Sequence, residues 1–135
     1  MGISTNFFIA TAADVRAMAY EAEKPPPHKA HPTVESKGLY PELLEHLAEL
    51  LDADGDMGEP ERDWGKDGPW VFELPDELVS ALSRLQGKAL DEIARRWADT
   101  ACVWVTVLGP LLSRLATLAA RARSEKKGVY LWVCM

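Results

Sequence analysis

The most constraining segment of the sequence is the run VYLWVC at residues 129–134, which is apolar at every position. A strand with one face in water would alternate apolar and polar side chains, and six residues are too few for a stable helix. Gly128 separates this run from the helical pattern before it. The sequence therefore predicts a strand buried on both faces at the centre of a sheet, and predicts that removing it unfolds the protein.

Length and composition predict a single domain over residues 1–135. The chain is 47% hydrophobic and 27% charged, which is close to average usage for a globular domain. A chain of about 150 residues buries roughly 68–70% of the surface exposed by its unfolded form, so folding requires neither a metal nor disulfides. The two cysteines, Cys102 and Cys134, lack redox or zinc-knuckle spacing, and their apolar neighbours predict inert thiols. We expect no cofactor.

Apolar residues at helical spacing predict four or five helices. The clearest begins near Pro41, a residue suited to the first turn of a helix, and carries glutamates opposite its leucines. Those leucines are Leu43, Leu44, Leu47, Leu50 and Leu51. Further helices are expected over residues 12–23, from Pro75, over residues 89–99 and from Pro110.

Shorter segments complete the pattern. Thr11, with Asp14 three residues later, is typical of a helix cap. Four prolines between residues 24 and 33 predict an extended connection, because proline supplies no amide donor. Three further strands are predicted over residues 6–10, 33–37 and 70–74.

One apolar stretch leaves two alternatives open. Residues 101–108 are rich in β-branched side chains, as in a strand, but lie between two helical patterns and could continue one of them to a break at Gly109-Pro110. Trp97, Trp104 and Trp132 fall on apolar faces, so we expect them in the core. The fold class is α+β, or mixed α/β, with a sheet of three or four strands covered by helices.

Three segments carry a resemblance to known proteins. They are the opening MGISTNFF, residues 36–39 ahead of the leucine-rich helix, and the basic ARAR at 120–123 that leads into YLWVC. Together they resemble a group of small actinobacterial proteins and, more distantly, the YfbM-like proteins of unknown function. The resemblance implies a similar order of helices and strands, but it implies no activity and no catalytic residue.

Charge is distributed unevenly along the chain. The formal net charge is −6, with −11 over residues 42–77, +5 over residues 84–127 and zero before residue 42. An acidic protein is not drawn to phosphate backbones or anionic membranes, so we expect neither nucleic acid nor membrane as a partner. No basic leader and no apolar run of spanning length is present, so we expect a cytoplasmic location. The oligomeric state is left open.

The acidic loop over residues 52–69 is the leading candidate for a contact surface. It contains Asp52, Asp54 and Asp56 and is flanked by Trp64 and Trp70, and aromatic side chains often anchor protein partners. Opposite potentials steer association, so the predicted partner is a basic protein. Bacterial immunity proteins that neutralise basic nuclease toxins share this size and acidity, and the analogy predicts an immunity-type protein-binding module.

Calcium binding is an alternative function for the same loop. Asp52, Asp54, Asp56 and Asp63 occupy positions one, three, five and twelve of a twelve-residue EF-hand-like loop. However, Met57 stands where an EF-hand has glycine, and an aspartate closes the loop instead of a glutamate. These departures favour a solvated acidic loop.

A second alternative is a ligand-binding protein or enzyme whose site is assembled only by the fold. The sequence contains no complete catalytic motif, which favours a protein that is not an enzyme. His28 and His31 lack the further ligands that zinc requires and are expected in a polar loop, and His46 is expected to pair with Glu42 on an exposed face. The polar residues that a folded site could use are Asn6, Tyr20, His28, His31, Asp99 and Tyr130.

Overall fold

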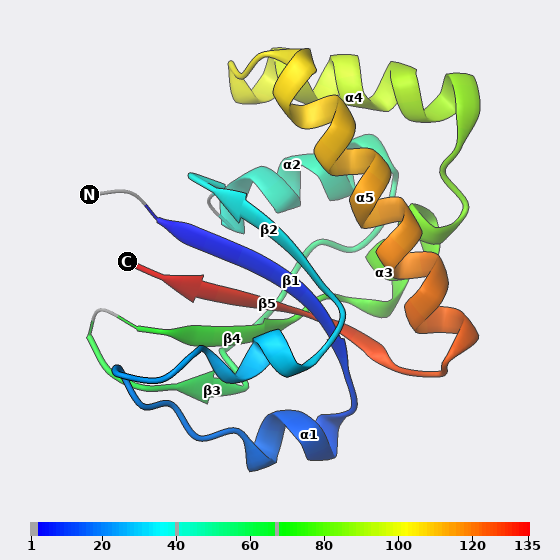
Figure 1. The fold of residues 1–135 in the computed structure, drawn as a ribbon. Helices are drawn as coiled ribbons and strands as arrows, with labels where there is room; N and C mark the ends of the chain where they lie inside the picture. Colours follow the sequence, from blue (N-terminus) through cyan, green and yellow to red (C-terminus); the bar gives the residue numbers. More distant parts are fainter. Residues whose placement is uncertain (1–2, 40, 67) are drawn as a thin grey trace.

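In the computed structural model, which describes residues 3–39, 41–66 and 68–135, helices cover one antiparallel sheet with the strand order β2-β1-β5-β4-β3. The strands are β1 Ser4–Ala10, β2 Thr33–Lys37, β3 Arg62–Asp63, β4 Trp70–Glu73 and β5 Gly128–Cys134. The helices are α1 Ala12–Ala17, the 3-10 turn η1 Pro27–Ala30, α2 Pro41–Leu50, α3 Asp76–Ser83, α4 Gly87–Ala101 and α5 Val105–Ser124 (Figure 1). The α+β class is confirmed, but the sheet has five strands and not three or four. The unexpected strand, β3, has two residues and therefore no periodicity to detect.

β5 lies at the centre of the sheet, as its apolar sequence predicts. It pairs with β1 on one side, where Phe8 faces Tyr130, and with β4 on the other, where Val71 faces Trp132. Successive side chains of a strand point to opposite faces, so β5 contributes to both sides of the sheet. Leu131 belongs to the core on one face, and Tyr130 and Trp132 belong to the cluster on the other.

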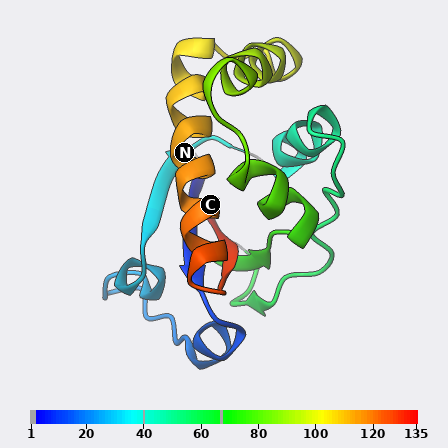
Figure 2. The same cartoon turned by 90° about the vertical axis from the view of Figure 1, so that its right-hand side faces the viewer.

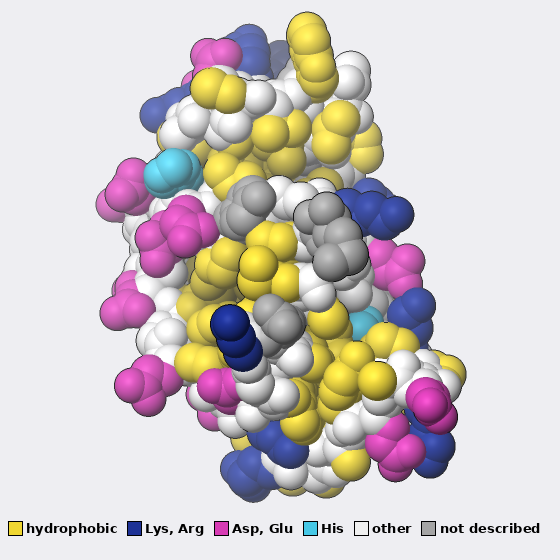
Figure 3. All heavy atoms as spheres, turned by 90° about the vertical axis from the view of Figure 1, so that its left-hand side faces the viewer, with side chains coloured by type: hydrophobic (Ala, Val, Ile, Leu, Met, Phe, Trp, Pro, Cys, Tyr) yellow, Lys and Arg dark blue, Asp and Glu magenta, His cyan; other side chains and the backbone are white. Residues whose placement is uncertain are grey.

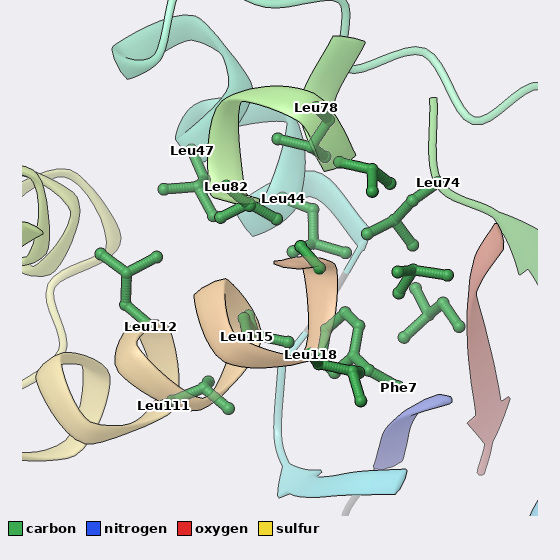
Figure 4. Close-up of a cluster of buried hydrophobic side chains, with 14 of the residues drawn as sticks. Phe7, Leu44, Leu47, Leu74, Leu78, Leu82, Leu111, Leu112, Leu115 and Leu118 are labelled. Atoms are coloured by element: carbon green, nitrogen blue, oxygen red, sulfur yellow. The ribbon is translucent and has the colours of Figure 1, made fainter. Parts of the chain in front are cut away.

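The helices α2, α3 and α5 pack over one face of the sheet, and α4 packs on α2 and α5, as Figure 2 shows from the side. Phe7 of β1 packs there against leucines from three helices, as the close-up in Figure 4 shows. These leucines include Leu44, Leu47, Leu78, Leu82, Leu112 and Leu115. Trp97 of α4 is fully buried, and its indole Nε1 donates a hydrogen bond to the carbonyl oxygen of Leu43 at 2.8 Å. Full burial of each large side chain contributes roughly 1.5–3 kcal/mol.

The opposite face of the sheet is covered by α1 and η1. The predicted cap at Thr11 is confirmed as a capping box, because its side chain accepts a hydrogen bond from the Asp14 amide while the Asp14 carboxylate accepts one from the Thr11 amide. α1 ends at Ala17 and does not continue to residue 23. Arg62 explains this early end, since its guanidinium donates hydrogen bonds to the carbonyls of Val15 and Arg16, which a longer helix would use internally.

The structure answers the open question at residues 101–108 in favour of two helices. α4 ends at Ala101, Cys102 takes a left-handed conformation, and α5 begins at Val105. The predicted break at Gly109-Pro110 is wrong, since α5 passes through Pro110. Both Pro110 and Thr106 are exposed, so water can bond to the Thr106 carbonyl that proline leaves without a donor.

Trp104 departs most from expectation. Its side chain is 80% exposed at the α4–α5 turn, whereas Trp97 and Trp132 are buried as predicted. The error arises because Trp104 lies in an apolar run whose helical phase is reset at Cys102.

As for membranes, no helix in the described part of the chain has the length and apolar character needed to cross one.

Candidate functional site

An acidic surface runs from α2 into the loop that follows it. Glu42, Glu45 and Glu49 are exposed along α2, and Asp52, Asp54 and Asp56 are exposed in the loop. We call these six residues the acidic face. Figure 3 shows carboxylate side chains spaced along the edge of the molecule occupied by α2. The sequence predicted the loop as the contact surface and an acidic face on the helix before it, and the fold joins the two into one surface.

Gly55 holds the loop against α2. A Cβ atom at this position would lie 2.7 Å from the Ala48 Cβ and 3.3 Å from the Glu45 Cα, so only glycine allows the two backbones to approach this closely. The amide of Ala53 also donates a hydrogen bond to the Ala48 carbonyl at 2.9 Å. The carboxylates of the loop and those of the helix are therefore held on one continuous surface.

We expect Gly55→Ala to destabilise the protein by about 1–3 kcal/mol, because the added methyl group forces the loop away from α2. Urea denaturation measures this change. Gly109→Ala is the comparison, since Gly109 lies in α5 and no atom beyond its chain neighbours lies within 4 Å of where a Cβ would stand. Because Pro110 follows it, alanine gains no helix propensity there, and we expect a smaller loss of stability than at Gly55. Equal effects of the two substitutions would contradict the close approach at Gly55.

Backbone hydrogen bonds to the aspartates shape the loop. The Asp54 carboxylate accepts one from the Asp56 amide at 3.0 Å, and the Asp56 carboxylate accepts one from the Gly58 amide at 2.9 Å. Asp52 has a φ of 55°, in the left-handed region that aspartate and asparagine tolerate better than most residues. Asparagine can therefore replace all three aspartates, removing charge while keeping an oxygen that accepts the same bonds.

The acidic face forms no close ion pair with a Lys or Arg among the described residues. Among the described residues, ion pairs within 4.0 Å join Lys24 to Glu21, Lys29 to Glu35, and Arg121 and Lys127 to Glu125, and none involves the acidic face. Glu42, Glu45 and Glu49 are spaced three and four residues apart, where like charges destabilise a helix by a few tenths of a kcal/mol per pair. The free protein thus bears an electrostatic cost on this surface.

The other predicted contact residues lie elsewhere. Trp64 packs on the α1 side of the sheet, with its ring 5.5 Å from Trp132 and the Arg62 guanidinium 4.7 Å above it. Trp70 packs against the core on the helical side. The two rings therefore lie on opposite faces of the sheet, and they do not form a joint anchor beside the acidic face.

The carboxylates of the EF-hand-like loop are not gathered into a metal site in the part of the chain that the structure describes. Within the described ranges, no group of three or more His, Cys, Asp or Glu side chains is arranged to hold a metal. Asp63, the proposed twelfth ligand, lies in β3, and its carboxylate accepts a hydrogen bond from the Gly65 amide at 2.9 Å. Asp52 borders a hollow of about 340 Å³ between the loop and α3, which also contains Arg84 and Arg123. Two guanidinium groups oppose cation binding there.

An aromatic cluster brings together several residues of the enzyme alternative. The His28 ring, expected in a polar loop, is instead fully buried, 4.7 Å from the Trp132 ring and 5.8 Å from Phe8. Tyr20, His31 and Tyr130 also contact this cluster. Asp99 lies on α4 in the helical layer, away from the group. The burial of His28 follows from the prolines around it, which turn η1 onto the sheet.

The cluster is a packed layer in which the pKa values of His28 and Tyr130 are both shifted away from neutral pH. Burial lowers the pKa of His28 to about 4, assisted by the charge of Lys29, so the ring is neutral near pH 7. Burial also raises the pKa of Tyr130 to about 12, so its hydroxyl stays protonated. Five hollows of about 340–580 Å³ are lined by described residues, and of the six candidates only Asn6 lines any of these five.

Two further expectations are corrected. His46 makes no ion pair with Glu42, since it is half-buried and its Nδ1 has no hydrogen-bond partner in the described structure. Cys102 is exposed and not enclosed by apolar neighbours, because it caps α4 in a left-handed conformation, while Cys134 is half-buried. Both cysteines are free, as expected.

Comparisons with protein-family models, curated proteins and solved structures found no match. The resemblance to YfbM-like proteins therefore stays a prediction, and a function for this chain has to be argued from its own surface.

Proposed function

We propose that this protein is a cytoplasmic protein-binding module that captures a basic protein through the acidic face. The observation that carries the proposal is the continuous set of six exposed carboxylates without a Lys or Arg within 4.0 Å among the described residues. Their mutual repulsion is relieved when a basic partner supplies the missing charges. By analogy in size and acidity, the favoured partner is a basic nuclease toxin neutralised in an immunity-type complex.

The acidic face fits this function better than the aromatic cluster fits catalysis. A binding surface needs exposed groups of one sign, which steer a partner of opposite charge toward it. Catalysis near pH 7 would favour a group poised to exchange protons in that range, but the pKa values of His28 and Tyr130 are shifted away from it in opposite directions.

The test is a pull-down from a lysate of the source organism with Asp52, Asp54 and Asp56 all changed to Asn. We expect the wild type to retain a basic protein at low salt and to lose it as salt rises, because screening weakens charge–charge attraction. The triple variant should capture at least about tenfold less of the basic protein than the wild type does. It should keep the loop hydrogen bonds and the stability of the free protein.

The control removes the same amount of charge elsewhere, by changing Glu21, Glu23 and Glu35 to Gln. These side chains are exposed near η1 and β2, outside the acidic face, so partner capture should persist. Equal capture by wild type and the aspartate variant would exclude the loop as the contact, and equal loss in both variants would show that only net charge matters. Inhibition of a nuclease activity in the captured protein would distinguish an immunity-type partner from other basic proteins.

A further inference from the structure

The outer face of α4 has no partner within the described structure. Figures 1 and 2 show α4 at the end of the molecule farthest from the sheet, with α2 below it and α5 beginning beside it. Ala94, Trp97 and Ala98 point into the core. The exposed side carries six charged residues, which are Lys88, Asp91, Glu92, Arg95, Arg96 and Asp99.

The six charges, three positive and three negative, form no close ion pair among the described residues. Four pairs of opposite charge are spaced four residues apart, which are Lys88 with Glu92, Asp91 with Arg95, Glu92 with Arg96, and Arg95 with Asp99. No ion pair within 4.0 Å involves any of the six among the described residues. Two of them also oppose the helix dipole. Lys88 lies in the first turn, near the positive end, and Asp99 lies in the last turn, near the negative end, so each placement is unfavourable in an isolated helix.

The order of the charges is complementary to itself in the reverse direction. When α4 is laid antiparallel to a copy of itself about its midpoint, between Ile93 and Ala94, every charge meets one of opposite sign. The three meeting pairs, each occurring twice, are Lys88 with Asp99, Asp91 with Arg96, and Glu92 with Arg95. The antiparallel arrangement also brings each unfavourable terminal charge beside its counter-charge on the other copy.

We propose that two copies of this chain associate through the outer faces of α4, related by a two-fold axis at the helix midpoint. A two-fold interface uses the same surface on both copies, so the surface must complement itself, and the charge order of α4 does. Binding to an unrelated partner would not require the charges of α4 to complement themselves in the antiparallel direction. The acidic face lies on α2 and its loop, so both copies would keep it accessible to a basic protein.

Exposed ion pairs contribute little each, so the interface also needs apolar area. Trp104 and Val107, 80% and 56% exposed, lie just beyond the C-terminal end of α4. A hollow of about 580 Å³ also lies between α4 and α5, lined in part by Arg95 of α4 and by Thr106 and Pro110 of α5. Antiparallel pairing carries Trp104 of each copy toward the first turn of the other copy's α4.

The experiment is sedimentation velocity across a wide concentration range, with two complementary charge-reversal variants. One variant has Arg95→Glu with Arg96→Glu, and the other has Asp91→Arg with Glu92→Arg. We expect the wild type to form a dimer that weakens with salt, and each variant alone to associate about tenfold less tightly or worse. An equimolar mixture should restore a dimer, because every meeting pair in the heterodimer is again opposite in sign.

A second pair guards against a folding defect. Lys88→Glu and Asp99→Lys each place a charge that suits the helix dipole, so each variant should fold at least as well as the wild type while losing self-association. Their mixture should again form a heterodimer.

Two further variants test the apolar contact and the effect of charge alone. Trp104→Ala should weaken the wild-type dimer. Glu42→Arg with Glu45→Arg, which changes the net charge as much as Asp91→Arg with Glu92→Arg does, should not weaken it. A monomeric wild type at all concentrations, or mixtures that associate no better than their components, would overturn the proposal.

Discussion

Deletion of residues 129–135 is expected to abolish cooperative unfolding and leave no folded protein. β5 provides the hydrogen-bond partner of both β1 and β4, so its loss divides the sheet into two separate pieces. The deletion also removes five buried side chains, whose combined contribution is comparable to the 5–15 kcal/mol that usually stabilises a domain. Circular dichroism and the dispersion of amide signals in NMR spectra measure the outcome.

Removal of Met135 alone is the control for this deletion. Its side chain is 62% exposed and follows the last residue of β5, so the free energy of unfolding of the shortened protein should stay within about 0.5 kcal/mol of the wild-type value. A folded protein after the larger deletion would mean that β1 and β4 can pair without β5, and the assignment of β5 as the organising strand would be wrong.

Acid is expected to destabilise the protein through His28. The folded state binds a proton at His28 only near pH 4, because burial and the charge of Lys29 lower its pKa, whereas the unfolded chain binds one near pH 6.5. Between these values the unfolded state holds more protons, so stability falls as pH falls. The contribution of His28 is fully retained above pH 6.5, and roughly 3 kcal/mol is lost by pH 4.

Two substitutions separate the charge of His28 from its polarity. His28→Leu should remove the loss between pH 6.5 and 4 and should also stabilise the protein at neutral pH, because neither ring nitrogen of His28 has a hydrogen-bond partner among the described residues. His28→Gln should remove the pH dependence without the gain, since a buried polar group remains. Urea titrations at several pH values give these differences, and an unchanged acid slope in both variants would exclude His28 as the titrating group.

The sequence predicted those elements whose pattern repeats. The leucines of α2 follow a helical period over several turns, and the apolar run of β5 excluded any exposed position. The capping box at Thr11 needed only two residues at fixed spacing. β3 could not be found in this way, because two residues have no period, and the early end of α1 depends on Arg62, which is more than forty residues away in the chain.

The candidate site was predictable in its charge but not in its shape. The sequence alone places an acidic helix before an acidic loop, and the close packing at Gly55 joins them into one surface. The expected partnership of Trp64 with Trp70 depended on sequence proximity, but their side chains point to opposite faces of the sheet. Trp104 could not be placed, since its exposure depends on one left-handed residue, Cys102, that changes the helical phase.

The central position of β5 also affects the order and the rate of the folding steps. Phe8 of β1 pairs with Tyr130 of β5, and most of the chain lies between these two residues. Such long-range pairing slows folding, because a large loop must close before the pair can form. The neighbouring helices α4 and α5 can meet early, since a short turn joins them. Until β5 arrives, β1 and β4 each present an unpaired edge with apolar side chains, and aggregation competes with folding during that interval.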